Sequence, residues 1–207
     1  MWLALAVAVA RAVRGEGPVT LREIRVAFFR NLNLGQARSH SPTSAQLLDA
    51  FVEAGARSPS HVGTNGTVVY YHSTGPTLVR RVAKLLTPMC GYRDMVTVRS
   101  GVALIELDRQ LRGLGDGEVV LFDREPGFDL PTPIESEDGL IVISFDHRRA
   151  ITQHRPGTRP TSATTFIASL VDVPVTTRSI TTMRRVADRV REYAEGPVPT
   201  VRGIRRG

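Results

Sequence analysis

Residues 24–32 read Ile-Arg-Val-Ala-Phe-Phe-Arg-Asn-Leu, a β-rich apolar run that fits a buried strand. Alternation along an extended chain places Arg30 on the face opposite Phe29. The residues that follow, Asn31-Leu32-Asn33-Leu34-Gly35, include Asn and Gly, which accept the positive φ of a tight turn. We therefore expect the folded part of the chain to begin near Glu23, with a strand that ends in a polar turn.

Helix and strand patterns alternate after this first strand. Apolar stripes at spacings of three and four predict four helices: one with Ser41 as N-cap and Pro42 as its first residue, one that begins at Thr74 or Pro76, and two capped by Ser100 and Ser179. A short helix is expected at 161–170, and β-rich runs predict strands at 67–71, 94–98, 118–122 and 140–145. This order predicts an α+β protein, with a ferredoxin-like (α/β plait) N-terminal part that has helices on one face of a sheet, followed by a smaller α+β part. A doubly wound parallel sheet is the alternative.

The domain organisation follows from where these patterns start and stop. Residues 1–22 form an expected N-terminal extension outside the core, because their apolar run lacks the leading positive charge of a secretory signal and the length of a membrane span. Residues 23–195 are expected to be a single α+β domain with sub-parts at about 23–114 and 115–195. Residues 196–207 combine Pro, Gly and Arg without an apolar period, which predicts a disordered basic tail. No repeat at a fixed period is evident.

Composition is that of a packed protein, with 42 % hydrophobic and 23 % charged residues. The formal net charge is +7, and Lys84 is the only lysine among 27 basic residues, which points to arginine-rich codon usage as well as to anionic partners. Acidic residues gather between 116 and 146 and arginines after 178, so the chain is dipolar. One cysteine, Cys90, excludes an internal disulfide, and we expect a cytoplasmic protein.

Common catalytic and cofactor motifs are missing from the sequence. No glycine-rich dinucleotide or nucleoside-triphosphate loop occurs, and the five histidines show no metal-binding helical pair. No nucleophile and general base occur at a spacing typical of a catalytic pair, so the sequence leaves open whether the protein is an enzyme. We expect no cofactor and no metal.

Two polar clusters carry the candidate ligand-binding residues. One follows the first strand, and the other, Thr176-Thr177-Arg178-Ser179, lies directly before the last helix, where free backbone N–H groups and the helix dipole favour an anion. Because no acidic residue adjoins either cluster, we expect them to form one site, although helix capping and ion pairing would explain each cluster alone. With the Asn65-Gly66 turn, the candidate anion-binding residues are Arg30, Asn31, Asn33, Gly35, Asn65, Gly66, Thr176, Thr177, Arg178 and Ser179.

Three motifs resemble the bacterial domain-of-unknown-function 1697 family. Residues 27–35 (AFFRNLNLG) resemble its opening ALLRGINVGG, and residues 63–70 (GTNGTVVY) resemble its QSGNVVF strand. Residues 166–182 (FIASLVDVPVTTRSITT) are similar to its FFEKKLGVPATTRNWNTV, although Asn31 and Ser179 depart from the family pattern. The resemblance implies a bacterial, cytosolic α+β fold with a ferredoxin-like part, and it implies no settled biochemistry.

Three classes of function follow from these observations. A binding module for a phosphorylated or otherwise anionic small molecule ranks first. A nucleic-acid-binding protein that uses the Arg-rich last helix and tail is an alternative, with weak, non-specific affinity because aromatic residues for base stacking make up only 6 % of the chain. A structural or interaction protein, self-associating as a homodimer through its acidic and basic segments, is the other alternative. No membrane partner is expected.

Overall fold

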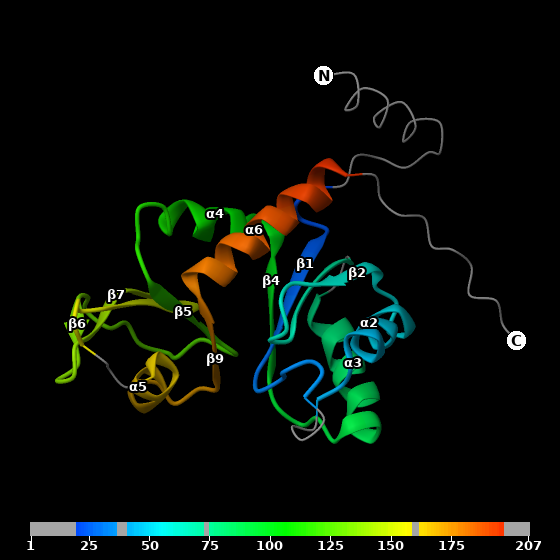
Figure 1. The fold of residues 1–207 in the computed structure, drawn as a ribbon, viewed down its shortest axis with the longest axis horizontal. Coiled ribbons are helices and arrows are strands. Elements are labelled where there is room, and N and C mark those ends of the chain that lie inside the picture. The colour runs from blue at the N-terminus through cyan, green and yellow to red at the C-terminus, as the bar shows by residue number, and fades with distance from the viewer. Residues whose placement is uncertain (1–19, 37–40, 73–74, 159–161, 197–207) are drawn as a thin grey trace, which may run out of the picture.

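The computed structural model describes residues 20–36, 41–72, 75–158 and 162–196, and it consists of two halves of similar plan (Figure 1). Nearly all of the predicted N-terminal extension and tail therefore lie outside the described residues. The N-terminal half contains β1 (Ile24–Phe29), α2 (Ser44–Glu53), β2 (Arg57–His61), β3 (Thr67–Tyr71), α3 (Gly75–Cys90), β4 (Val96–Ser100) and α4 (Gly101–Gln110). The C-terminal half contains β5 (Gly117–Phe122), β6 (Ile134–Glu135), β7 (Leu140–Asp146), β8 (Arg149–His154), α5 (Ala163–Leu170), β9 (Val175–Ser179) and α6 (Ile180–Glu195).

The sheet of the N-terminal half has the strand order β2-β3-β1-β4. β1 pairs antiparallel with both β3 and β4, and α2 and α3 form the two crossovers of a ferredoxin-like β-α-β-β-α-β unit. The α+β prediction is confirmed. The doubly wound parallel alternative is wrong, because every strand pairing in the described residues is antiparallel.

The sheet of the C-terminal half repeats this plan, with the order β6-β7-β8-β5-β9. β5 lies between β8 and β9, as β1 lies between β3 and β4. α5 and α6 then take the places of α3 and α4, while the segment at 123–139 stands where the first half has α2. The expected smaller α+β part is therefore a second ferredoxin-like unit with one helix replaced by a loop.

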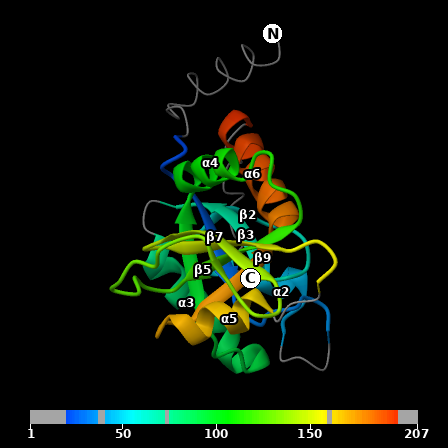
Figure 2. The same ribbon diagram turned by 90° about the vertical axis from the view of Figure 1, so that its left-hand side faces the viewer.

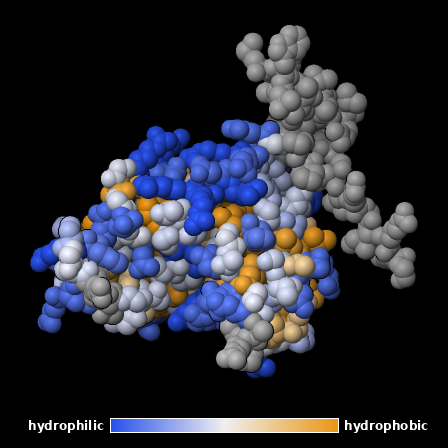
Figure 3. Space-filling model, in the orientation of Figure 1, coloured by the Kyte–Doolittle hydropathy of each residue, from blue (hydrophilic) through white to orange (hydrophobic). Residues whose placement is uncertain are grey.

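A shared hydrophobic core joins the two sheets. Alternation along β1 turns Val26 and Phe28 towards this core and Phe29 towards α2 and α3. α4 and α6 lie side by side over both sheets in Figures 1 and 2 and close the core with apolar residues such as Leu107 and Val186. Their outer surface is mainly hydrophilic (Figure 3). None of the helices in the described ranges is long and apolar enough to cross a membrane.

Four strands of the described residues, β2, β6, β8 and β9, are not predicted by the sequence pattern. β6 has only two residues, and the other three are polar in composition: β2 reads RSPSH and β8 reads RAITQH. β9 reads VTTRS, where a loop before the last helix is expected. Half-exposed or interface strands need no continuous apolar run, so β-propensity alone does not reveal them.

Gly66, in the turn between β2 and β3, gives a test of this packing. Its φ is +63°, and a Cβ there would lie 2.9 Å from Phe29 Cβ and 3.0 Å from Leu32 Cβ. Gly113 has a similar φ of +78° with no heavy atom within 4 Å of such a Cβ. We expect Gly66→Ala to lower the free energy of unfolding by about 1–3 kcal/mol more than Gly113→Ala, measured by urea unfolding. Equal losses would show that Gly66 is required for its φ alone.

Candidate functional site

Seven of the ten candidate residues line one pocket of about 240 Å³, here called the strand-end pocket. It lies where β1 ends, beside β9 and the β2–β3 turn. Gly35, Gly66 and Ser179 are not among its lining residues. The described residues that line the strand-end pocket are Phe29, Arg30, Asn31, Leu32, Asn33, Asn65, Thr164, Val175, Thr176, Thr177 and Arg178.

The turn after β1 has the backbone expected of it. Asn31 has a φ of +52° and Gly35 a φ of +80°, so the predicted positive-φ turn is confirmed. Gly35 belongs to this turn and does not line the strand-end pocket. Asn33 is exposed, and its backbone N–H donates to Ser41 Oγ at 3.1 Å.

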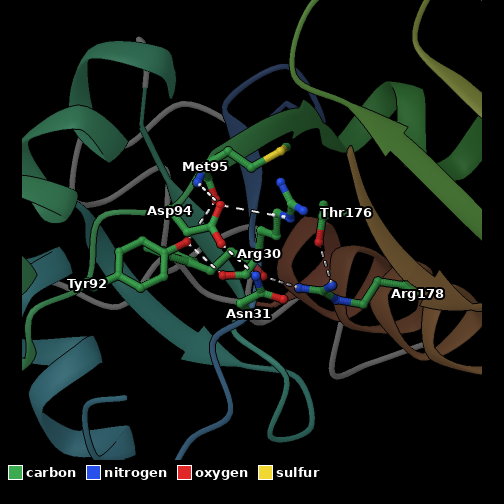
Figure 4. A network of polar contacts seen from close by, with 8 residues as sticks. Arg30, Asn31, Tyr92, Asp94, Met95, Thr176 and Arg178 are labelled. Carbon is green, nitrogen blue, oxygen red and sulfur yellow. Dashed lines mark hydrogen bonds and ion pairs between the residues drawn. The ribbon is translucent and has the colours of Figure 1, made fainter. Parts of the chain in front are cut away.

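An acidic residue, Asp94, holds part of this cluster (Figure 4). Its Oδ2 accepts a 2.7 Å hydrogen bond from Asn31 Nδ2, and its Oδ1 lies 3.9 Å from Arg30 Nε. The Tyr92 hydroxyl donates to the carbonyl oxygens of Arg30 (3.0 Å) and Met95 (2.8 Å), which fixes the strand end. No acidic residue adjoins the cluster in sequence, but the fold brings Asp94 to it from 63 positions away.

Arg178 forms the inner wall of the strand-end pocket and is 5 % exposed. Its Nε donates to Thr67 Oγ1 (2.9 Å), and its Nη1 donates to Thr176 Oγ1 (3.0 Å). Nη2 donates to the carbonyl oxygens of Phe29 (2.9 Å) and Asn65 (2.6 Å), which belong to the N-terminal half. The guanidinium is saturated by acceptors of the chain itself, so its fork does not grip a ligand.

The chain segment around Arg178 also differs from its prediction. Thr176, Thr177 and Arg178 belong to β9 and pair with Leu121, Val120 and Val119 of β5. These residues are therefore part of an edge strand, in which alternate N–H groups face β5, and they are not a loop at a helix N-terminus. Ser179 caps α6 with its Oγ, which accepts from Thr182 N at 3.1 Å. The expected helix-terminus anion site is wrong, because the strand extends to the first residue before the helix.

The positive charge of Arg178 has no carboxylate partner among the ion pairs of the described residues. Burial lowers the pKa of Arg178 to about 10 because the charged form loses its hydration, yet the side chain stays charged at neutral pH. Its guanidinium carbon lies 5.7 Å from the centre of the Phe28 ring. The pocket therefore has a fixed, desolvated positive charge behind it.

Arg99 repeats this arrangement from the other half. It is 8 % exposed, and its Nη1 donates to Thr97 Oγ1 (2.6 Å). Its Nη2 donates to the carbonyl oxygens of Phe122 (2.8 Å) and Arg148 (2.9 Å) in the C-terminal half. Arg178 and Arg99 thus make reciprocal bridges. Each arginine lies on an edge strand of its own half and binds the other half at two places, the end of β1 or β5 and the β2–β3 or β7–β8 turn.

The sequence carries a signal for this pair that the motifs considered above do not include. Residues 96–100 read VTVRS and residues 175–179 read VTTRS, each forming a strand whose last Ser caps the next helix. In both segments the Arg and the Thr two residues before it lie on the same face of the strand, towards the other half. A repeated V-T-x-R-S pattern without a fixed-period repeat around it indicates two diverged copies of one unit.

The rim of the strand-end pocket carries polar groups with spare hydrogen-bonding capacity. Thr164 Oγ1 and Thr177 Oγ1 lie 2.5 Å apart, and together they have one proton beyond the one they share. The Asn33 amide makes no hydrogen bond within the described ranges, and the Asn65 amide oxygen accepts from Thr67 Oγ1 at 3.1 Å, which leaves its NH2 group as a donor. Arg30 contributes a guanidinium with a 37 % exposed side chain. No group of three or more His, Cys, Asp and Glu side chains in the described residues could hold a metal ion.

A comparison with solved structures finds the same fold in a conserved bacterial protein, SP0830 from Streptococcus pneumoniae. The two chains are 12 % identical with a TM-score of 0.55, over 82 % of this chain and 98 % of that one. No family model matches the sequence, and no curated protein matches it. The structural likeness concerns the fold alone, and the family resemblance given by the motifs stays a prediction.

The reciprocal arginines give a stability prediction. Arg178→Lys keeps the charge but leaves the Phe29 and Asn65 carbonyls and the Thr67 hydroxyl without their donor. We expect it to lower the free energy of unfolding by on the order of 3–5 kcal/mol, with a similar loss for Arg99→Lys. Thermal or urea unfolding measures this, with exposed Arg81→Lys as the control, which we expect to change stability by less than about 0.5 kcal/mol. A loss as small as that of Arg81→Lys would contradict the bridging role.

Proposed function

We propose that the protein is a binding module for a small anionic molecule, such as a phosphorylated or carboxylated metabolite, held in the strand-end pocket. One observation carries the proposal: a buried arginine without a carboxylate partner lies behind a polar pocket whose lining residues include Arg30 and no acid. An anion in the pocket would supply the counter-charge that the fold does not.

Arg178 acts in this proposal as a fixed positive charge, and rim residues make the direct contacts. Its guanidinium is already hydrogen-bonded to the chain, but its field reaches the pocket through a poorly screened interior, where charges interact more strongly than in water. Arg30, Asn33, Asn65 and the Thr164–Thr177 pair provide donors that face the pocket opening. The pocket volume of about 240 Å³ fits a small anion better than a large ligand.

Arg30 must leave Asp94 to grip a ligand with its full fork. Its Nε lies 3.9 Å from Asp94 Oδ1, and both side chains are about one-third exposed, so this ion pair is weak. Asp94 in turn keeps its 2.7 Å bond from Asn31 and a 2.7 Å bond from the N–H of Met95. Arg30 can therefore exchange partners without leaving Asp94 unsatisfied.

The arginines of α6 favour a small anion over nucleic acid. Arg191 pairs with Asp108 and Asp188, and Arg189 pairs with Glu192 at 3.1 Å. Arg184 donates to the carbonyl oxygens of Leu111 (2.9 Å) and Leu114 (2.7 Å). These contacts engage much of the positive charge on α6 that a nucleic-acid phosphate backbone would need. Residues 197–207 of the basic tail lie outside the described ranges.

Inorganic phosphate and sulfate test the proposed site through thermal unfolding. We expect either ion to raise the Tm of the wild-type protein. At a hundredfold excess over Kd, the free energy of unfolding should increase by about 2.7 kcal/mol. Arg30→Gln should abolish the gain and change the Tm without ligand very little, because its ion pair is exposed.

Arg80→Gln is the matched control, since Arg80 is exposed on α3 and lies outside the pocket lining. Sodium chloride at equal ionic strength controls for screening. The proposal fails if Arg30→Gln keeps the full gain, or if chloride produces the same gain as phosphate.

A further inference from the structure

A second and larger cavity, here called the inter-half cleft, opens between α4 and β4 of the N-terminal half and the β7–β8 turn of the C-terminal half. Its volume is about 520 Å³, roughly twice that of the strand-end pocket. None of its lining residues is shared with the strand-end pocket, so the two cavities are distinct. The described residues that line the inter-half cleft are Arg25, Pro76, Val98, Arg99, Ser100, Ala103, Glu106, Asp146, His147, Arg148 and Arg149.

Positive charge exceeds negative charge in this lining, with four arginines against two carboxylates. Both carboxylates are already engaged: Glu106 pairs with Arg109 at 2.9 Å, and Asp146 Oδ2 pairs with Arg149 at 3.2 Å. Asp146 Oδ1 also accepts from the backbone N–H groups of Arg148 (2.7 Å) and Arg149 (3.0 Å). Little acidic capacity is therefore left to neutralise the remaining arginines.

Arg148 is the cation that is most available to a ligand. Its side chain is exposed and makes no hydrogen bond or ion pair with the described residues, while its carbonyl oxygen accepts from the buried Arg99 at 2.9 Å. The turn that carries Arg148 is therefore held rigidly by its backbone. A substitution of this side chain leaves that backbone anchor intact.

Arg149 adds positive charge to the lining but has internal partners. Its side chain is 16 % exposed, and one terminal nitrogen, Nη2, donates to Gln110 Oε1 at 2.9 Å and pairs with Asp146. Arg148 is therefore better placed than Arg149 to contact a ligand.

The inter-half cleft and the strand-end pocket occupy equivalent positions with respect to the two pseudo-symmetric halves. In each cavity a bridging arginine, Arg99 or Arg178, lies next to the hairpin turn of the opposite half, at Arg148 or Asn65. The first residues of α3 and α5, at Pro76 and Thr164, border the two cavities in equivalent positions. The turn carries a cation, Arg148, in the larger cavity and an amide, Asn65, in the smaller one, so the two cavities differ in charge at this position.

We propose that the inter-half cleft binds an organic phosphate of nucleotide size with at least two negative charges, of which a nucleoside diphosphate is the model compound. The volume lies within the usual range for small-molecule sites, and guanidinium groups pair well with phosphate oxygens. Pro76, Val98 and Ala103 provide apolar wall for the organic part. This site is additional to the small-anion site of the strand-end pocket and does not depend on it.

Calorimetric titration with ADP, inorganic pyrophosphate and adenosine tests the proposal on the full chain. We expect ADP and pyrophosphate to bind and adenosine to fail, because charge pairing supplies most of the affinity. Arg148→Glu should weaken ADP binding by at least about tenfold, the effect of losing one charge-assisted contact. Thermal unfolding without ligand should be nearly unchanged in this variant, since the exposed side chain makes no hydrogen bond or ion pair with the described residues.

Two control variants show whether ADP binding depends on the cleft itself. Arg112→Glu makes the same charge change at an exposed position outside the lining, and Arg30→Gln removes the rim cation of the strand-end pocket. Both should keep wild-type affinity for ADP. The proposal is overturned if ADP does not bind at millimolar concentration, if Arg112→Glu weakens binding as much as Arg148→Glu, or if Arg30→Gln alone abolishes binding.

Discussion

Two buried guanidiniums, those of Arg99 and Arg178, form reciprocal hydrogen-bonded bridges between the halves of this protein, and the rest of the structure depends on these bridges. Each belongs to an edge strand of one half, and its Nη2 donates to two carbonyl oxygens of the other half. Burying a charge costs free energy unless its hydrogen bonds are replaced, so the acceptors must stay where they are. The ends of β1 and β5 and both hairpin turns are fixed by that requirement, and both cavities are built from these fixed pieces.

The same constraint places a buried positive charge beside each cavity. A bridging arginine must remain charged to keep its donors, and in the described structure neither has a carboxylate in ion-pair contact. Burial, together with the neighbouring charges of Arg148 and Arg149, lowers the pKa of Arg99 to about 10. Charge of this kind is present before a ligand arrives, so binding would need little rearrangement of the interior.

Much of the fold could be predicted from the sequence because its signals are local. The apolar run at β1, the serine caps of α4 and α6 and the positive-φ turn at Asn31 and Gly35 each arise within a few residues. The strand β9 could not be predicted, because its polar residues become buried only through contacts with the other half. The role of Asp94 could not be predicted for the same reason: it reaches Asn31 across 63 positions of sequence. The position of Arg178 before the last helix, with no acidic residue beside it, favours a ligand-binding role in the sequence, whereas its main contacts in the fold are internal.

The reciprocal bridges have a consequence for how such proteins diverge. Because Arg99 and Arg178 are held by backbone carbonyls, which every residue type supplies, the strand ends around them can change sequence while the bridges persist. In this chain the two V-T-x-R-S segments mark the strands that carry these bridges. Ligand specificity would then change through substitutions at the rims of the cavities, where Arg30, Asn33 and Arg148 make few contacts within the fold. One scaffold could thereby acquire new ligands through a handful of surface substitutions and leave its interior untouched.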